Sequence, residues 1–299
     1  MRQEKCAVFI LLGQSNAVGH GVPMQEVDKV SRPMKNVFGL SREKNQSFDI
    51  DALCFEGYTT AGMNLAEEQD DTYSVANLLA KKWQARIDAG AVLPDLYIVH
   101  IAIGAQGVTE GYMWHPDRER VLKPGKLGTV DISLYPFTEH ILSLVDQYFR
   151  SAGKEYEVIG LHFRGGENDT TAEKQILEKE LFSIYTRIFD GFAKRLGKYP
   201  LVLHKIVCPD RCNDLDPSGE KLRRMEYINE VFMRLAAKYG GEIFDATKAP
   251  QFIPDVRGNG IFIDDCVHYT PEVNAWVAET ILEEYSTDTV PVLHPGDDG

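Results

Sequence analysis

The chain lacks an excess of positive charge. Its 299 residues carry 32 Lys and Arg against 45 Asp and Glu, which gives a formal net charge of −13 at pH 7. Proteins that bind nucleic acid or dock onto anionic membranes need clustered Lys and Arg to meet the phosphates. The balance therefore argues against both partners. It favours a neutral or cationic small substrate, unless a local basic pocket overrides the overall sign.

Long hydrophobic runs are also missing. The apolar run near the N-terminus covers only 7–12 (AVFILL), which is short for the core of a secretory signal. No other stretch approaches the roughly 20 apolar residues that a membrane-spanning helix needs. We therefore expect a cytoplasmic protein, with a signal peptide removed before residue 1 as the open alternative.

Cysteines are few and scattered, at positions 6, 54, 208, 212 and 266. An odd, unpatterned set does not indicate a disulfide framework. Cys208, Cys212 and His204 lie close together in sequence, but no second ligand pair follows, so a metal site is not predicted. We expect reduced thiols, with Cys266 as a small buried side chain and not a nucleophile.

Short apolar runs bounded by turn residues indicate strands that are buried on both faces. Five such runs are present, at 7–12, 96–103, 156–163, 201–207 and 242–245. Between and after them, apolar residues recur at helical spacing over 75–89, 137–149, 172–196, 222–239 and 271–285. This alternation predicts an α/β fold, in which helices cover both faces of a parallel sheet.

The chain is 43% hydrophobic, which is enough apolar material for one core, and we expect a single domain over 1–287. The segment 19–71 is polar, lacks a clear period and is long for a connection, so we expect a loop insertion that shapes the substrate pocket. Residues 288–299 are rich in Pro, Gly and Asp and are expected to form a loose C-terminal tail.

A serine directly follows the first expected strand, in Gly13-Gln14-Ser15-Asn16. Ligands of open α/β sheets bind at the carboxyl ends of the strands, so Ser15 stands where a nucleophile is useful. Gly13 permits a tight turn. A serine at this place is more often only a turn or cap residue. The G-x-S-x-G pattern is absent because position 17 is Ala, which argues against the α/β-hydrolase fold proper.

Asp265 and His268 form a D-x-x-H spacing just before the last expected helix. A serine hydroxyl needs a base to become nucleophilic at neutral pH, and histidine suits that role. The histidine needs a carboxylate to hold its tautomer. Asp265 has the better spacing for this, although Asp264 is also near.

Two Gly-containing loops follow the second and third expected strands, at 103–107 and 164–169. A parallel sheet would place both loops beside Ser15. Glycines let backbone N–H groups approach a tetrahedral oxyanion closely. One such loop alone would be an ordinary turn, but both together favour an oxyanion-binding site.

Together, these motifs resemble the SGNH hydrolase superfamily, and more closely its sialate O-acetylesterase-like group, which includes carbohydrate esterase family six. Those proteins carry G-Q-S-N, a G-G-T-like loop, Q-G-E-x-D and a terminal D-x-x-H, in that order. In this chain the corresponding stretches are 13–16 (GQSN), 104–107 (GAQG), 165–169 (GGEND) and 265–268 (DCVH).

The resemblance implies a three-layer α/β/α flavodoxin-like fold with a five-stranded parallel sheet. It implies removal of O-acetyl groups from an acetylated sugar or oligosaccharide, without a metal or other cofactor. Ser15 would attack the acetyl carbonyl, and His268 would take the serine proton and later protonate the leaving alkoxide. Asp265 would orient His268, and the backbone N–H groups of Ser15 and Gly104 would hold the oxyanion.

The chain departs from the family pattern at two positions. Gly165 stands where the family has Gln, so a side-chain donor to the oxyanion is missing unless Asn16 or Gln106 supplies it. Losing such a donor typically costs about a hundred- to a thousand-fold in rate. Ala105 replaces the second glycine of the second loop, which we expect to be mild because the backbone N–H is kept.

Several residues are candidates for supporting the site or binding the substrate: Gln14, Gln106, Gly166, Glu167, Arg164 and Trp114. Glu167 could hold His268 or organise the loops around Ser15, and the structural role is favoured because Asp265 is available. Trp114 and Tyr112 could stack on a sugar ring or belong to the core. Arg164 or Arg257 could meet the carboxylate of an acidic sugar.

Two other hypotheses remain at this point. The scaffold could serve a lipase-like enzyme or thioesterase acting on other small acyl substrates, which would require an apolar channel. The chain could also be a non-catalytic carbohydrate-binding relative, which the loss of the third-loop Gln favours and the retention of Ser15, Asp265 and His268 opposes.

Overall fold

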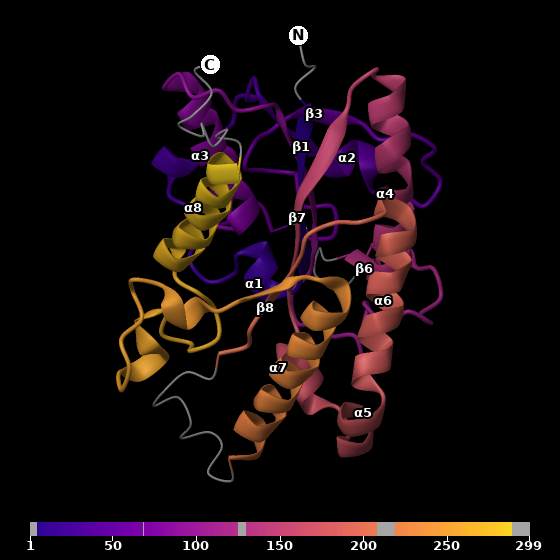
Figure 1. Cartoon of the computed structure of the whole chain (residues 1–299), viewed down its shortest axis with the longest axis vertical. Coiled ribbons are helices and arrows are strands. Elements are labelled where there is room, and N and C mark those ends of the chain that lie inside the picture. Colours follow the sequence, from indigo (N-terminus) through magenta and orange to yellow (C-terminus); the bar gives the residue numbers. More distant parts are fainter. Residues whose placement is uncertain (1–4, 68, 125–129, 208–218, 289–299) are drawn as a thin grey trace, which may run out of the picture.

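The structure is a computed structural model that describes residues 5–67, 69–124, 130–207 and 219–288. Cys208, Cys212 and the expected tail beyond residue 288 lie outside the described residues. Within these ranges, helices cover both faces of one central sheet, which forms a three-layer α/β/α architecture (Figure 1). The α/β prediction is confirmed.

The central sheet has seven strands in the order β3-β2-β4-β1-β7-β8-β9. All neighbouring pairs are parallel except β2 and β3. The strands are β1 (Cys6–Gly13), β2 (Val37–Leu40), β3 (Phe55–Gly57), β4 (Leu96–Ala102), β7 (Tyr156–Arg164), β8 (Leu201–His204) and β9 (Glu242–Phe244). A separate antiparallel pair joins β5 (Leu122–Pro124) to β6 (Val130–Ile132).

All five expected strands are present, but the expected strand count was too low. The segment 19–71 supplies β2 and β3, which extend the sheet beyond β4, together with the short helix α2 (Arg42–Asn45). These strands have only four and three residues, too few to show a periodic pattern. The segment is therefore in part an extension of the sheet and not only a loop insertion.

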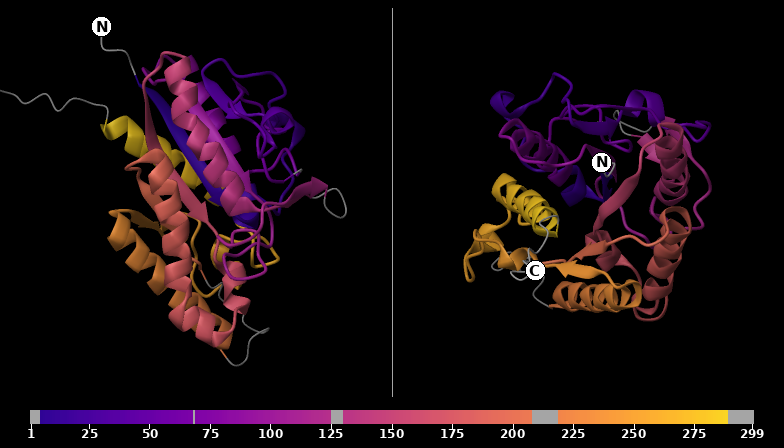
Figure 2. Two further views of the ribbon diagram at one scale, coloured as in Figure 1. Left: turned by 90° about the vertical axis from the view of Figure 1, so that its right-hand side faces the viewer. Right: turned by 45° about the horizontal axis from the view of Figure 1, so that its top comes forward.

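The helices form two layers (Figure 2). On one face, α3 (Val75–Asp88) packs against α8 (Pro271–Asp288), and on the other α4 (Leu134–Ser151), α6 (Leu181–Leu196) and α7 (Glu220–Tyr239) pack side by side. The single helix expected over 172–196 is wrong. It begins only at α5 (Lys174–Lys179) and is interrupted at Glu180, before α6 starts at Leu181.

Strand β1 lies at the centre of the sheet, and every one of its residues is buried. Its last residue, Gly13, pairs with Ala102 at the end of β4 and with Arg164 at the end of β7. The three loops that follow these strands therefore begin side by side. Gly13 has a φ of 143°, and a Cβ there would lie 1.9 Å from the Arg164 carbonyl oxygen, so only glycine fits.

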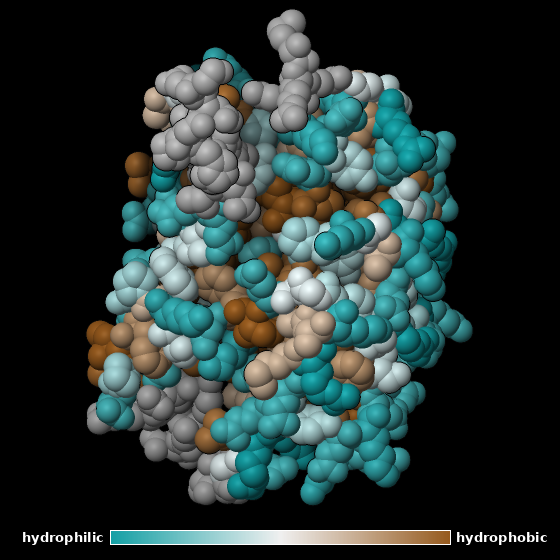
Figure 3. Space-filling model, viewed as in Figure 1, coloured by the Kyte–Doolittle hydropathy of each residue, from teal (hydrophilic) through white to brown (hydrophobic). Residues whose placement is uncertain are grey.

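The face seen in Figure 3 is mostly hydrophilic, with apolar side chains gathered in smaller groups. No helix in the described part of the chain is long and apolar enough to cross a membrane.

Candidate active site

Ser15 begins the four-residue helix α1 (Ser15–Val18), one residue beyond the turn at the end of β1. The Gln14 N–H donates to the Arg164 carbonyl at 2.8 Å, which ties this turn to the end of β7. Ser15 is 7% exposed. Its hydroxyl forms no hydrogen bond with any residue that the structure describes. Ser15 thus stands at the carboxyl edge of the sheet with a hydroxyl that is not held by a neighbour.

Asp265 and His268 form a hydrogen-bonded pair within one loop. His268 Nδ1 lies 2.6 Å from Asp265 Oδ2, and the other carboxylate oxygen accepts the backbone N–H groups of Val267 and His268 at 2.8 and 3.0 Å. Burial raises the pKa of Asp265, but these hydrogen bonds outweigh it and lower the pKa below its ordinary value. A charged Asp265 places the proton of His268 on Nδ1 and leaves Nε2 available as a base.

Asn16 joins this loop to the turn of Ser15. Its amide nitrogen donates to the Val267 carbonyl at 3.2 Å, and its amide oxygen accepts the Tyr269 N–H at 3.2 Å. The residue next to the serine therefore contacts both neighbours of His268. No hydrogen bond joins the Ser15 hydroxyl to His268 among the described contacts. Catalytic hydrogen bonds are often long without substrate and tighten when it binds.

Glu167 lies under the same turn. Its two carboxylate oxygens accept from Gln14 Nε2 at 2.6 Å and from Asn16 Nδ2 at 3.0 Å, so it bridges the two neighbours of Ser15. His268 is bonded to Asp265. This arrangement supports the positioning role for Glu167 and Gln14.

The expected oxyanion role of Asn16 is not supported by the structure. The amide has two N–H donors, and they are directed to Glu167 and to the Val267 carbonyl. An oxyanion could gain Asn16 only if one of these bonds broke. Asn16 therefore joins the turn of Ser15 to Glu167 and to the loop of His268. Its place in the GQSN motif did not indicate this role.

The loop after β4 also differs from expectation. The Gly104 N–H donates to Glu67 Oε2 at 2.8 Å, so this donor is occupied. Ala105 has a φ of 57°, a left-handed conformation that glycine adopts more readily, so the Ala105 departure is less mild than expected. Gln106 accepts the Met113 N–H at 3.0 Å, and its amide nitrogen is 3.5 Å from the Gly104 carbonyl. Gln106 therefore stabilises its own loop.

Asp169 links the two Gly-containing loops and was not assigned a role from the sequence. It is fully buried, and it accepts the N–H groups of Val108 and Thr109 at 2.8 and 3.2 Å and the Tyr185 hydroxyl at 2.8 Å. Burial outweighs these hydrogen bonds and raises the pKa of Asp169 to about 6. A Cβ at Gly107 would lie 2.4 Å from Asp169 Oδ1, which explains the glycine.

Trp114 and Arg164 lie in the core and not at a substrate surface. Trp114 is fully buried, and its indole N–H donates to the Gly13 carbonyl at 3.1 Å, so it is a support of the turn and not a platform for a sugar. Arg164 is 2% exposed, donates to Asn274 Oδ1 at 2.9 Å and lies over the Tyr269 ring. It cannot reach a substrate carboxylate from there. Burial lowers the pKa of Arg164 to about 10.

The glycines of the third loop are explained by packing. A Cβ at Gly165 would lie 3.0 Å from the Phe163 ring, so the family's Gln at this place needs Phe163 to shift. Gly166 has a φ of 109°, and a Cβ there would lie 3.0 Å from both Ile206 and Phe232. Gly166 thus serves the close packing of the loop on the core.

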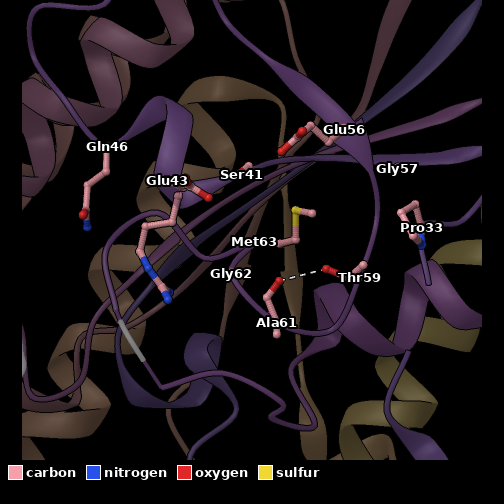
Figure 4. Close-up of a pocket in the computed structure, with 11 residues that line it drawn as sticks. Pro33, Ser41, Glu43, Gln46, Glu56, Gly57, Thr59, Ala61, Gly62 and Met63 are labelled. Atoms are coloured by element: carbon pink, nitrogen blue, oxygen red, sulfur yellow. Dashed lines mark hydrogen bonds between the residues drawn. The ribbon is translucent and has the colours of Figure 1, made fainter. Parts of the chain in front are cut away.

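The segment 19–71 lines a pocket of about 550 Å³, shown in Figure 4. Met63 and the Thr59–Ala61 turn, closed by a hydrogen bond of 2.9 Å, line it together with charged side chains of Arg42, Glu43 and Glu56. Neither Ser15 nor His268 is among the lining residues. The segment therefore shapes a pocket of its own, and its role at the serine site remains a prediction.

Cys266 is disulfide-bonded. Cys6 and Cys54 are free thiols. The expectation that all thiols are reduced is therefore wrong for Cys266, which lies between Asp265 and His268. Sequence spacing cannot reveal such a pairing, because it depends on which loops meet in the fold.

The sequence matches no protein-family profile and no curated protein. The fold, however, is similar to that of solved structures. NanS aligns over 96% of this chain and 99% of its own, with a TM-score of 0.59 and 14% identity. A protein from Arabidopsis thaliana aligns over 95% and 99%, with a TM-score of 0.54 and 14% identity. At this identity the likeness to both structures is one of fold, and it extends along almost the whole chain.

Proposed function

We propose that this chain is a serine esterase that removes O-acetyl groups from a carbohydrate. The observation that carries the proposal is the pair of hydrogen bonds that Asn16, the residue after Ser15, forms with the two neighbours of His268. These contacts support an arrangement in which Ser15, His268 and Asp265 act together as nucleophile, base and orienting carboxylate.

In this mechanism, Ser15 Oγ attacks the acetyl carbonyl carbon while His268 Nε2 takes the hydroxyl proton. The charge that develops on the carbonyl oxygen meets the Ser15 N–H, and the Gly104 N–H once that donor is released. The tetrahedral intermediate collapses to an acetyl-enzyme, and His268 gives its proton to the leaving sugar oxygen. Water, activated by the same histidine, then releases acetate. Asp265 stabilises the histidine in its charged state.

The substrate class is supported by the sequence motifs and by the low exposure of Ser15. The stretches 13–16 and 265–268 resemble those of the carbohydrate esterases named above. Ser15 is only 7% exposed, which suits a short acyl group better than a long chain.

Hydrolysis of p-nitrophenyl acetate and butyrate by the wild type and by Ser15→Ala tests the proposal. We expect acetate turnover that is lost in the variant, and a preference for acetate over butyrate. Acetate release from acetylated sugars then identifies the substrate. A preference for butyrate supports an enzyme for other acyl substrates. Turnover that survives in Ser15→Ala rules out Ser15 as the nucleophile.

A second candidate, a non-catalytic carbohydrate-binding protein, is favoured by one observation. Neither the Asn16 amide nor the Gly104 N–H is available to an oxyanion in this structure, and Gly165 offers no side chain. A serine-directed phosphonate separates the two functions, because an activated Ser15 is labelled and an inert one is not.

A further inference from the structure

The proposed mechanism requires the Gly104 N–H as a hydrogen-bond donor, and a carboxylate of the protein already accepts a hydrogen bond from it. Glu67 Oε2 accepts the Gly104 N–H at 2.8 Å, at the end of the strand that neighbours β1. The Glu67 side chain is 12% exposed, so the group is enclosed and does not point into open solvent.

The His20 side chain also lies next to this carboxylate. Its Nε2 lies 3.5 Å from the same Glu67 oxygen, and a Cβ at Gly104 would lie 2.6 Å from its ring. The His20 N–H donates to the Ser15 carbonyl at 3.0 Å, and its ring meets that of His268 edge to face at 5.8 Å. His20 therefore contacts the Glu67 carboxylate and the ring of the proposed base, and its backbone is bonded to the turn of the nucleophile.

We propose that the Gly104 N–H and the His20 imidazole form a carboxylate-binding subsite, which Glu67 fills as an internal ligand. Glu67 must withdraw before an acyl oxygen, or a free carboxylate such as acetate, can occupy the subsite. The effect on catalysis rests on the proposed esterase function, whereas the binding of a carboxylate does not.

The charge of Glu67 makes it a strong competitor. Burial raises the pKa of Glu67, but His20 and the Gly104 N–H outweigh it, with a further contribution from Arg42, and the pKa is lowered. Glu67 is therefore ionised at neutral pH, and hydrogen bonds to a charged acceptor are about twice as strong as neutral ones. A substrate carbonyl, which is neutral before attack, does not displace it easily.

The backbone of Glu67 is held independently of its side chain. Arg42 Nη1 donates to the Glu67 carbonyl at 2.6 Å, and its guanidinium pairs with Asp70 at 2.9 Å. In the proposal, the Glu67 side chain rotates away from the Gly104 N–H while its backbone stays in place. This is the movement that the substitutions below imitate.

The first test measures hydrolysis of p-nitrophenyl acetate by Glu67→Gln and Glu67→Ala. We expect kcat/KM to rise in both, by about ten-fold in Glu67→Ala, because that variant vacates the N–H. Glu26→Gln is the control, since it removes one negative charge from a side chain that is 88% exposed and should leave kcat/KM unchanged. A fall in kcat/KM with Glu67→Gln, at unchanged thermal stability, would show that Glu67 is a prop of the loop and would overturn the proposal.

The second test does not depend on catalysis. Carbonyl-¹³C isoleucine with ¹⁵N-glycine selects the amides of Gly104 and Gly160, the two glycines that follow an isoleucine. Both are titrated with acetate in Ser15→Ala and in Ser15→Ala/Glu67→Ala. We expect acetate to shift the Gly104 resonance only in the double variant, and the Gly160 resonance, from within β7, in neither.

The two tests separate the two proposals. Acetate binding at Gly104 in the double variant without ester hydrolysis in any variant supports the subsite and contradicts the esterase function. Hydrolysis that is lost in Ser15→Ala but not raised by Glu67→Ala, without an acetate shift at Gly104, supports the esterase and overturns the subsite.

Discussion

The amide nitrogen of Asn16 lies 3.0 Å from Glu167 Oε1, although the two residues are 151 positions apart in the chain. The second Glu167 oxygen accepts from Gln14 at 2.6 Å. One carboxylate on the loop after β7 thus holds both neighbours of Ser15, and Asn16 passes this constraint to the loop of His268.

Glu167→Gln should lower kcat/KM for p-nitrophenyl acetate by about ten- to a hundred-fold, because an amide replaces one acceptor by a donor and leaves a donor facing a donor. The effect should appear mainly in kcat, since the residue positions Ser15 and does not contact the substrate. Glu173→Gln, an exposed carboxylate on the same segment, is the matched control and should behave as the wild type. Equal kinetics of the two variants would show that Glu167 does not position the turn.

Asp265→Asn should lower kcat by about a thousand-fold or more, because an amide facing Nδ1 no longer holds the required tautomer of His268. Asp264→Asn tests the neighbouring carboxylate, which is exposed, and should retain activity. The opposite result would move the orienting role to Asp264.

The stability of the wild type should depend on the charge of Asp265. Its folded-state pKa is lowered, so its contribution to stability is present above the unfolded pKa of about 4 and is lost as pH falls through the folded value. We expect Asp265→Asn to be less stable than the wild type at neutral pH, with the difference shrinking in acid. Chemical denaturation at both pH values measures it.

Asp169 should affect stability with the opposite pH dependence. Its folded-state pKa of about 6 lies above that of the unfolded chain, so the folded protein holds a proton there that the unfolded chain releases. That stabilisation is present in acid and is lost as pH rises through about 6. Asp169→Asn keeps an oxygen for Val108 and Thr109, so its stability relative to the wild type should improve by about 1 kcal/mol between about pH 5 and pH 7.5. Urea unfolding at these values is the measurement, and an unchanged difference would contradict the raised pKa.

Three buried histidines should make the whole protein sensitive to acid. Burial lowers the pKa of His100 to about 4 and that of His162 to about 3, and lowers the pKa of His204 well below its ordinary value. Below about pH 6.5 these histidines bind protons in the unfolded chain but stay neutral in the folded protein. The free energy of unfolding therefore falls as pH falls.

Asp169 acts against this trend, because it binds one proton in the folded protein that it lacks in the unfolded chain. The free energy of unfolding should still fall by about 2 kcal/mol or more per pH unit near pH 5. Urea midpoints measured from about pH 7 to pH 5 should fall accordingly. His100→Gln, which removes one of the three groups, should flatten the slope.

What the sequence by itself determined was local. The five main strands were predictable because continuous apolar runs between turn residues reflect burial on both faces. Asp265 and His268 were recognised as a pair because three positions within one loop suffice to bring them together. Ser15 was proposed as the nucleophile because of its place after the first strand. The structure confirms that place, and the role of Ser15 stays a prediction.

The tertiary structure decided everything that depends on distant residues meeting. Strand β2 pairs with the edge of β4 and β3 pairs with β2, and the few residues of these strands show no pattern of their own. Trp114 is buried where its indole N–H meets the Gly13 carbonyl, and Arg164 is buried against Asn274 and the Tyr269 ring. Which N–H groups are occupied, at Asn16 by Glu167 and at Gly104 by Glu67, follows from loops that meet only in the fold, and one sequence contains no local signal for such contacts.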